Sequence, residues 1–409
     1  MQKIIPVLLG ADLNCYNVAR AFHEQYGVVS YAFGRYAVSA TKYSRIVRFT
    51  AVPDMDDEAT MLRVLGEFAA AHPEGKRILF GCTDDYAAMI IRNQEKLPAY
   101  LCPCPAPRFL DSVSRKAEFY EMCDRYGIPY PKTVVLTGAE PADALSPERL
   151  GFPYPIIVKP SSSVVYWKHP FDGMKKVYVA RTAQEAEKVL SEIYGAGYDE
   201  RMILQEFIPG GDEHMRVLTA FSDRRGRVRA MCLGHTMLEE HTPKGLGNHA
   251  AIVTEPVTSL PFYDRLRAML EDLGYTGFSN FDIKYTGHGD DYRVFEINLR
   301  QGRSNYYVTA AGLNIARLAA EVYEDGGEDC VLNERRVFWH YVPKSVAYTY
   351  TEDPALIAAA KTLAGEGAES SPLWYGPDLR FNPLRWICVC EMLRRQKKKF
   401  RIYYPVQPK

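Results

Sequence analysis

The sequence lacks several features that would place it in a specialised class of protein. Its nine cysteines are scattered, and neither Cys102/Cys104 nor Cys388/Cys390 has the spacing or the accompanying histidines of a zinc site. No run reaches the roughly 18 apolar residues that a membrane-spanning helix needs. The opening residues show neither a basic stretch nor a small-residue cleavage site, so we expect no signal peptide. These absences favour a soluble protein with reduced thiols in the cytoplasm.

An excess of charge of one sign is also absent. The chain has 50 basic and 50 acidic side chains, so no bulk field attracts nucleic acid, and we expect no nucleic-acid partner. The local exception is residues 380–401, where an apolar stretch runs into a basic cluster. Such a segment favours loose contact with an anionic membrane surface. A terminal helix that packs on the rest of the protein, with a solvated basic end, is the simpler interpretation.

The length of 409 residues allows two or three packed domains. Short apolar runs alternate with helical patterns from the start, with a strand at Ile4–Leu9 and a helix at Tyr16–Tyr26. This alternation predicts a doubly wound parallel sheet. Ligands on such sheets lie beyond the carboxyl ends of the strands, which directs attention to the turns at 10–14 and 81–85. Ordinary helix caps explain both turns equally well.

A proline-dense segment at residues 102–107 cannot form a helix or a central strand, so we interpret it as a linker. A single long amphipathic helix is expected over Asn305–Tyr323. The predicted regions are a Rossmann-like domain at 1–110, mixed strands and helices at 111–210, two hairpins and the long helix at 211–329, and an extension with a basic tail at 330–409.

A candidate metal site lies in a predicted hairpin. Two runs of alternating residues, at 280–285 and 292–298, flank turn-forming residues and place Asp282 opposite Glu296, with Asn298 on the same face. Two carboxylates that close repel each other unless a cation lies between them. Carboxylate and amide oxygens suit Mg²⁺, so we predict these three residues as its ligands. A polar, solvent-facing strand face is the alternative.

Two arginines follow the hairpin directly. Arg300 and Arg303 suit the transferred phosphoryl group and a substrate carboxylate, because a planar guanidinium binds oxyanions in a bidentate manner. Gly302 and Ser304 lead into the predicted helix, whose free N–H groups could bind an anion. Ser304 also fits a simple helix cap.

The order of these residues resembles the metal and phosphate motif of the ATP-grasp superfamily. In that resemblance Lys116 fits the lysine that opens the nucleotide site, Lys159 fits the strand-end lysine on the ATP phosphates, and Ser161 begins a serine-rich segment in place of a glycine-rich flap. Asp212 or Glu213 fits the acid on the ribose. The residues that fit the adenine-binding hinge are Gln205, Glu206, Phe207 and Ile208.

The implied fold is of the α/β and α+β classes, an ATP-grasp fold with an N-terminal doubly wound parallel-sheet (pre-ATP-grasp) domain. Residues 111–210 would form its lid and central region, and 211–329 its C-terminal metal-binding region. ATP and Mg²⁺ are the implied cofactors.

The chain from the first strand to about residue 325 is similar to the D-aspartate ligase group. The matching stretches include 5–14, 112–131, 275–282 and 296–304. This resemblance implies an acid–amino-acid ligase that activates the β-carboxylate of D-aspartate and joins it to a lysine side chain of a peptidoglycan precursor peptide. It also suggests that His235 lines the substrate site, although a structural histidine fits as well.

Two further interpretations stay open at the level of sequence. The chain could be another ATP-grasp amino-acid or dipeptide ligase, or a biotin-carboxylase-like enzyme. It could also be a non-catalytic ATP-binding regulator or scaffold, although the intact lysines and metal ligands count against that.

Overall fold

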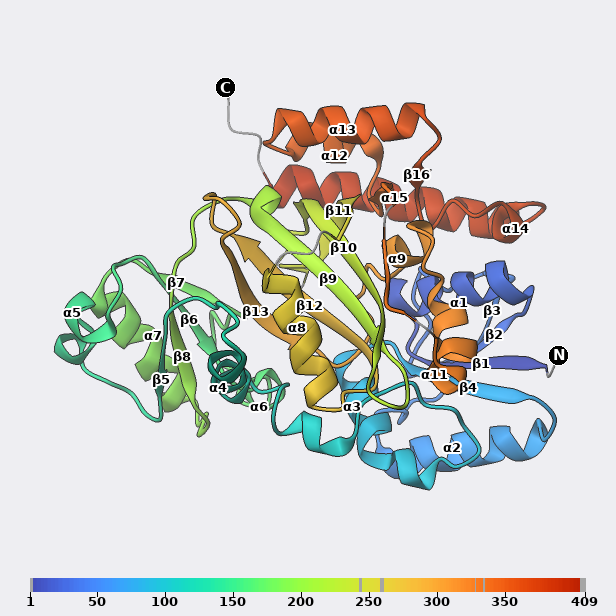
Figure 1. Cartoon of the computed structure of the whole chain (residues 1–409), viewed down its shortest axis with the longest axis horizontal. Coiled ribbons are helices and arrows are strands. Elements are labelled where there is room, and N and C mark those ends of the chain that lie inside the picture. The colour runs from blue at the N-terminus through green and yellow to red at the C-terminus, as the bar shows by residue number, and fades with distance from the viewer. Residues whose placement is uncertain (1–2, 243–244, 258–260, 328, 334, 405–409) are drawn as a thin grey trace. The chain divides into compact units, whose positions relative to one another are not determined.

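The computed structural model describes residues 3–242, 245–257, 261–327, 329–333 and 335–404 (Figure 1). The chain forms two compact units. The larger unit comprises Met1–Phe109, Gly211–Asp282 and Ile297–Lys409, and the smaller unit comprises Leu110–Gly210 and Ile283–Glu296. The division into four regions expected from the sequence remains a prediction.

The larger unit begins with a four-stranded sheet in the order β3-β2-β1-β4, in which every neighbouring pair is parallel. Leu8 of β1 points into a cluster with α1, whereas its neighbours Val7 and Leu9 point into a cluster with α2 and α3. Helices therefore cover both faces, because alternate strand residues face opposite sides. This confirms the predicted doubly wound sheet. Its elements are β1 (Ile4–Leu9), α1 (Leu13–Tyr26), β2 (Ser30–Gly34), β3 (Val47–Ala51), α2 (Glu58–Ala71), β4 (Lys76–Gly81) and α3 (Asp84–Asn93).

The two turns singled out in the sequence both act as helix caps. Asp12 accepts a hydrogen bond from the backbone N–H of Cys15 at 3.2 Å at the start of α1. Thr83 does the same for α3. Gly81 is required before α3, because a Cβ there would lie 2.4 Å from the backbone nitrogen of Ala87.

The second sheet has the strand order β13-β12-β9-β10-β11-β15-β16, with β14 paired to β10. Strands β9, β10 and β11 form an antiparallel meander. The expectation of two hairpins in this region is therefore corrected to a meander plus the β12–β13 hairpin. The strands are β9 (Met215–Ser222), β10 (Val228–Glu239), β11 (His249–Glu255), β12 (Gly277–Tyr285), β13 (Tyr292–Asn298), β14 (Val331–Leu332), β15 (Phe338–His340) and β16 (Glu369–Ser370).

The single helix expected over Asn305–Tyr323 is wrong. The chain instead forms short segments, namely α9 (Tyr306–Ala310), α10 (Ile315–Arg317), a π-helical turn (Leu318–Val322) and α11 (Tyr323–Asp325). Gly312 adopts a left-handed φ of 101°, which ends the first segment. Asn314 then caps α10 by accepting hydrogen bonds from the backbone N–H groups of Ala316 and Arg317.

The smaller unit contains a four-stranded sheet in the order β5-β8-β6-β7, joined by antiparallel pairs. Thr182 caps α7, because its hydroxyl accepts from the Glu185 N–H, and the Glu185 carboxylate accepts from the Arg181 N–H just before the helix. The elements are α4 (Lys116–Tyr126), β5 (Thr133–Leu136), α5 (Pro147–Leu150), β6 (Ile156–Pro160), α6 (Ser163–Tyr166), β7 (Tyr178–Ala180), α7 (Ala183–Gly195) and β8 (Met202–Glu206).

The C-terminal part of the chain is helical and belongs to the larger unit. Val389 and Phe400 are buried in the same cluster as residues of β1 and α1. Residues 405–409 of the expected basic tail lie outside the described residues. The remaining helices of the larger unit are α8 (Pro261–Asp272), α12 (Lys344–Tyr350), α13 (Pro354–Gly365), α14 (Gly376–Leu379) and α15 (Pro383–Tyr403).

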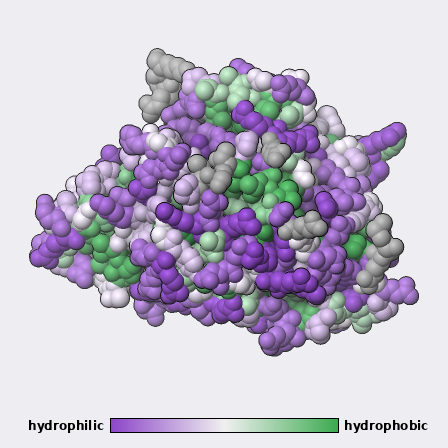
Figure 2. Space-filling model, viewed as in Figure 1, coloured by the Kyte–Doolittle hydropathy of each residue, from purple (hydrophilic) through white to green (hydrophobic). Residues whose placement is uncertain are grey.

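Across the described part of the chain, no helix has both the length and the hydrophobicity to span a membrane. Hydrophilic residues cover most of the face shown in Figure 2, and hydrophobic residues appear there as separate patches.

Candidate functional site

A buried lysine lies on strand β6 of the smaller unit. Lys159, on β6, is 7% exposed, and its ammonium group donates to Gln205 Oε1 at 2.9 Å and to the Tyr120 hydroxyl at 3.2 Å. The ammonium also lies 5.6 Å from the centre of the Phe295 ring. The Gln205 amide is itself held, because it donates to Thr133 Oγ1 at 2.8 Å. The lysine is therefore fixed in place by its surroundings.

A second lysine forms an ion pair with a predicted metal ligand. Lys116, the first residue of α4, places its Nζ 2.8 Å from Glu296 Oε2 on β13. Lys116 first, and then Lys176 and Lys159, hold the pKa of the Glu296 carboxyl well below its usual range. Three cations thus surround one carboxylate, which leaves a net positive charge that suits a polyphosphate.

The predicted hinge follows β8. The Glu206 carboxylate accepts from the backbone N–H of Lys132 at 2.9 Å, so it is engaged within the sheet. Ile208 is buried, whereas the Phe207 ring is 39% exposed with the Lys284 ammonium 5.8 Å from its centre. Ser161 follows β6 and is buried, and its backbone N–H donates to the Arg201 carbonyl at 2.9 Å.

The two candidate ribose acids differ in their contacts in the larger unit. The Asp212 carboxylate accepts from the backbone N–H of Glu239 at 2.8 Å and lies 3.1 Å from His241 Nε2. The Glu213 carboxylate accepts from the Gly211 N–H at 3.1 Å. Asp212 is therefore the more fully engaged of the two.

His235, on β10, uses both ring nitrogens inside the fold. Its Nδ1 lies 2.8 Å from Glu255 Oε1, and its Nε2 lies 2.7 Å from the Glu213 carbonyl. These contacts match the structural interpretation of this histidine.

The loop after β13 lies against the N-terminal sheet of the larger unit. Arg300 Nε donates to Asp84 Oδ1 at 2.7 Å, and Gln301 donates to the Gly81 carbonyl at 3.2 Å. Arg303 Nη1 donates to Glu240 Oε1 at 2.8 Å. Gln301 also donates to the Asn14 side chain. The loop therefore contacts both turns that the sequence singled out, at residues 10–14 and 81–85.

Gly302 lets this loop lie close to β12. A Cβ on Gly302 would lie 2.6 Å from Asn280 Oδ1, so the backbone approaches β12 closely. Asn298 Nδ2 donates to the Asn280 carbonyl at 3.5 Å, as expected if these two strand residues are neighbours. Ser304 is buried and precedes α9, which has only five residues, so the helix-terminus argument for an anion site is weak.

Asp282 has a neighbour that sequence reasoning missed. His249 Nε2, on β11, lies 3.8 Å from Asp282 Oδ1, and its Nδ1 lies 3.5 Å from Glu239 Oε1. Burial raises the pKa of Glu239 to about 7, with further contributions from Asp212 and Asp282. His249 and Glu239 lie on neighbouring strands far from the recognised motifs, so only the β10–β11 pairing could have indicated them.

The donor set of the predicted metal ligands fits Mg²⁺ in chemical type. Within the described ranges no group of three or more His, Cys, Asp and Glu side chains is arranged to hold a metal ion. The predicted set is instead two carboxylates and an amide, Asp282, Glu296 and Asn298. Mg²⁺ commonly completes such a set with water and substrate phosphates.

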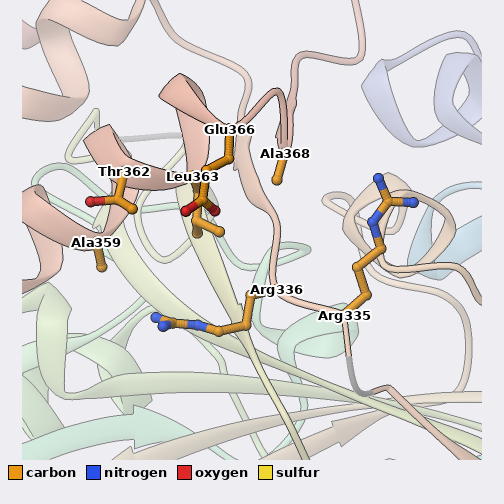
Figure 3. Close-up of a pocket in the computed structure, with 7 residues that line it drawn as sticks. All are labelled: Arg335, Arg336, Ala359, Thr362, Leu363, Glu366 and Ala368. Carbon is orange, nitrogen blue, oxygen red and sulfur yellow. The ribbon is translucent and has the colours of Figure 1, made fainter.

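A surface pocket of about 530 Å³ lies elsewhere in the larger unit, at the end of α13 (Figure 3). Arg336 extends beneath the helix, whereas Arg335 points away from it. None of the predicted site residues lines this pocket, so it is distinct from the lysine cluster of the smaller unit. Its lining residues are Arg335, Arg336, Ala359, Thr362, Leu363, Glu366 and Ala368.

Comparison with known sequences gives a match along the full chain. The protein is 35% identical over 417 residues to the D-aspartate ligase of Enterococcus faecium (strain Aus0004), which covers 99% of this chain and 98% of that protein. A carbamoyl phosphate synthase large chain of Thermus thermophilus is 30% identical over 240 residues, which is 56% of this chain and 21% of that protein. No protein-family profile matches the sequence.

Several solved structures share the fold of this chain. The L-amino acid ligase from Bacillus licheniformis aligns with a TM-score of 0.54 at 14% identity, over 79% of this chain and 74% of that chain. The biotin carboxylase of Campylobacter jejuni, solved as a β-γ-ATP complex, aligns with a TM-score of 0.58 at 15% identity, over 80% of this chain and 73% of that chain. The biotin carboxylase domain of the Hydrogenobacter thermophilus 2-oxoglutarate carboxylase was solved with MgADP. It aligns with a TM-score of 0.59 at 13% identity, over 81% of this chain and 73% of that chain.

These structures confirm the expected ATP-grasp fold, with its parallel N-terminal sheet and its mixed second sheet. The identity and coverage of the full-length sequence match then decide the family. The chain is an ATP-grasp carbon–nitrogen ligase and belongs to the D-aspartate ligase family.

Proposed function

We propose that this protein is an ATP- and Mg²⁺-dependent ligase that phosphorylates the β-carboxylate of D-aspartate. It then joins that carboxylate to the lysine side-chain amine of a peptidoglycan precursor peptide. The observation that carries the proposal is the match to a D-aspartate ligase, which extends over 98% of that protein.

The reaction has two steps. A β-carboxylate oxygen attacks the γ-phosphorus of ATP, the bond from that phosphorus to the bridging oxygen breaks, and ADP leaves. The amine nitrogen then attacks the acyl carbon, the bond from carbon to the phosphate oxygen breaks, and inorganic phosphate leaves. The amine must arrive deprotonated, and an unperturbed lysine has a pKa near 10.4, so a base or water has to take its proton.

The smaller unit supplies the positive charge for the nucleotide. Lys116 and Lys159 would neutralise the non-transferred phosphates, and the ion pair with Glu296 orients Lys116 before ATP arrives. Mg²⁺, when bound to Asp282, Glu296 and Asn298, would supply charge neutralisation across the phosphates.

The hinge after β8 is the proposed adenine site. Phe207 presents an exposed ring there, while Gln205 is fixed by Thr133 and Tyr120. Glu213 is the better candidate for the ribose hydroxyls, because Asp212 is engaged by His241 and by a backbone N–H group.

The proposal includes a loose contact of α15 with an anionic membrane surface. The buried side of this helix carries Arg385, Val389 and Gln396. Helical periodicity places Leu384, Ile387, Arg394 and Lys398 on the opposite side. Leu384 and Ile387 are 57% and 59% exposed, and Arg394 and Arg395 are 69% and 64% exposed.

The test of the ligase activity is ADP release by the full chain with ATP, Mg²⁺ and a lysine-containing precursor peptide. D-aspartate should support turnover far above the background without amino acid, whereas L-aspartate, D-glutamate and D-alanine should not. Stronger turnover with any of these three would assign another amino-acid ligase. Release no higher than the background with all four would overturn the proposal.

A further inference from the structure

Arg303 is held on two sides by residues that are distant from it in the sequence. Its Nη1 pairs with Glu240 at 2.8 Å, and its guanidinium lies 5.0 Å from the centre of the Tyr341 ring. Although burial alone would lower the pKa of Arg303, Glu240, Tyr341 and Asp12 raise it above its usual value, so the side chain stays charged. The group is 25% exposed, so it remains accessible from one side.

The two arginines of the loop differ in the partners that hold them. Asp84, the partner of Arg300, is 68% exposed, so water can replace it at little cost when an anion binds. Glu240, the partner of Arg303, is only 4% exposed, and its displacement would leave a buried charge without compensation. Arg303 therefore keeps its acidic partner when a ligand binds.

The C-terminal helix supports the ring under Arg303. Tyr341 is 4% exposed, as is Gln396 on α15, and the Gln396 amide donates to the Tyr341 hydroxyl. The backbone N–H of Tyr341 donates to the Ala250 carbonyl at 2.9 Å. The ring is held at its hydroxyl and at its backbone, so the guanidinium lies over a fixed surface.

We infer that Arg303 binds the α-carboxylate of the substrate amino acid, the one that is not phosphorylated, and that Glu240 and Tyr341 are positioning residues for it. A guanidinium has five N–H donors, and these two partners use only some of them. A carboxylate carries one negative charge, whereas a phosphoryl group carries more and would be repelled by the fixed Glu240 carboxylate. Arg300, whose partner Asp84 can be displaced, would then bind the phosphoryl group. The inference rests on the proposed function.

The test compares D-aspartate with D-isoasparagine, in which the α-carboxylate is an amide and the β-carboxylate is unchanged. Hydroxylamine serves as the amine and traps the acyl phosphate as a hydroxamate, so no acceptor peptide is needed. The wild-type enzyme should prefer D-aspartate in kcat/KM by at least about 100-fold, because a neutral amide replaces the negative charge that Arg303 would bind. In Arg303→Lys this preference should fall at least about 10-fold, while the KM for ATP changes less than about twofold.

The positioning role is tested by a pair of changes at Tyr341. Tyr341→Leu removes the ring and should raise the KM for D-aspartate about 5- to 10-fold with a smaller change in kcat. Tyr341→Phe keeps the stacked ring and should retain most of the preference. Arg63→Lys, which alters an exposed ion pair on α2, is the matched control and should leave both constants unchanged.

The outcomes separate this inference from the function on which it rests. If wild-type enzyme forms no hydroxamate with D-aspartate, the proposed function fails. If D-aspartate is used but Arg303→Lys lowers turnover equally with both amino acids, Arg303 does not bind the α-carboxylate. If Tyr341→Leu behaves as Tyr341→Phe does, the ring does not position it.

Discussion

Glu296 balances the charge of the lysine cluster in the smaller unit. Its carboxylate pairs with Lys116 at 2.8 Å, and Lys176 and Lys159 also lower its pKa. The same side chain is a predicted Mg²⁺ ligand, so we expect it to act both before and after the nucleotide binds. A neutral amide of the same shape would remove both contributions while preserving the packing.

Glu296→Gln is therefore expected to lower the turnover number by at least about 100-fold. The fold should remain, because only one charge is lost and the volume is unchanged. Steady-state ADP release at saturating Mg²⁺ measures the effect, with circular dichroism as the check on folding. Glu67→Gln, an exposed carboxylate on α2, is the control and should behave as the wild type does. If Glu296→Gln turns over as fast as the wild type, Glu296 is not an active-site residue.

Sequence reasoning selects candidate site residues most readily where they lie in short motifs. The candidate at Lys159 ends a buried strand, and the candidates at Glu296 and Arg300 lie close together in one short motif, so a local pattern was sufficient to select them. Glu240 and Gln396 escaped notice because their partners, Arg303 and Tyr341, lie 63 and 55 residues away. Only the folded chain brings such pairs together.

The C-terminal helices are joined to the N-terminal sheet region by a fully buried ion pair. Arg385 of α15 donates to Asp378 Oδ2 of α14 at 2.9 Å, and both side chains are 0% exposed. Asp378 also accepts from the Tyr16 hydroxyl of α1 at 2.8 Å and from the Ser44 hydroxyl at 2.9 Å. The Arg385 guanidinium lies 4.5 Å from the centre of the Tyr16 ring. One carboxylate therefore ties together two elements that are more than 300 residues apart in the sequence.

Asp378→Asn should lower the free energy of unfolding by about 3 kcal/mol, because it leaves the Arg385 cation buried without a counter-charge. Urea unfolding of the full chain, followed by circular dichroism, measures this change. Glu391→Gln is the matched control, since that carboxylate pairs with two exposed arginines on the same helix and its loss should leave the midpoint unchanged. Equal midpoints for all three proteins would show that the buried pair contributes nothing to stability.

At the scale of elements, the sequence predicted strands better than helix continuity. The strand expected at Ile4–Leu9 appears with its predicted bounds, because a buried apolar run is a local signal. The hydrophobic spacing over 305–323 is helical throughout, which is why one helix was expected there. The chain forms separate segments because Gly312 ends one and Asn314 starts the next. Backbone conformation at two residues outweighed the periodicity of the whole stretch.

The whole molecule has no net charge, yet its charges are unevenly distributed. Along α15 the exposed cations Arg394, Arg395, Lys397, Lys398 and Arg401 accompany one acidic residue, Glu391. Apolar side chains are exposed near the start of the same helix. Phe381, just before the helix, is 79% exposed, and Ile387 within it is 59% exposed. Apolar anchors beside a basic cluster suit the interface of an anionic bilayer. The burial of Val389 and Phe400 shows that the opposite side of the helix packs on the protein, so only this outer side is available.

The membrane contact predicts that the full chain sediments with vesicles containing phosphatidylglycerol at low salt and is released at high salt. Each cation near such a surface contributes roughly 1 kcal/mol, so Lys397→Glu combined with Lys398→Glu should lower partitioning by about 10-fold or more. Leu384→Ser combined with Ile387→Ser should weaken binding at every salt concentration, because the apolar contribution is not screened.

Lys188→Glu on α7 and Val331→Ser on β14 are exposed controls for charge and for apolar area, and neither should change sedimentation. If the wild-type chain stays in the supernatant at low salt, or if the control variants bind as weakly as the α15 variants, the membrane contact is rejected. The helix α15 would then serve only to pack against the rest of the larger unit.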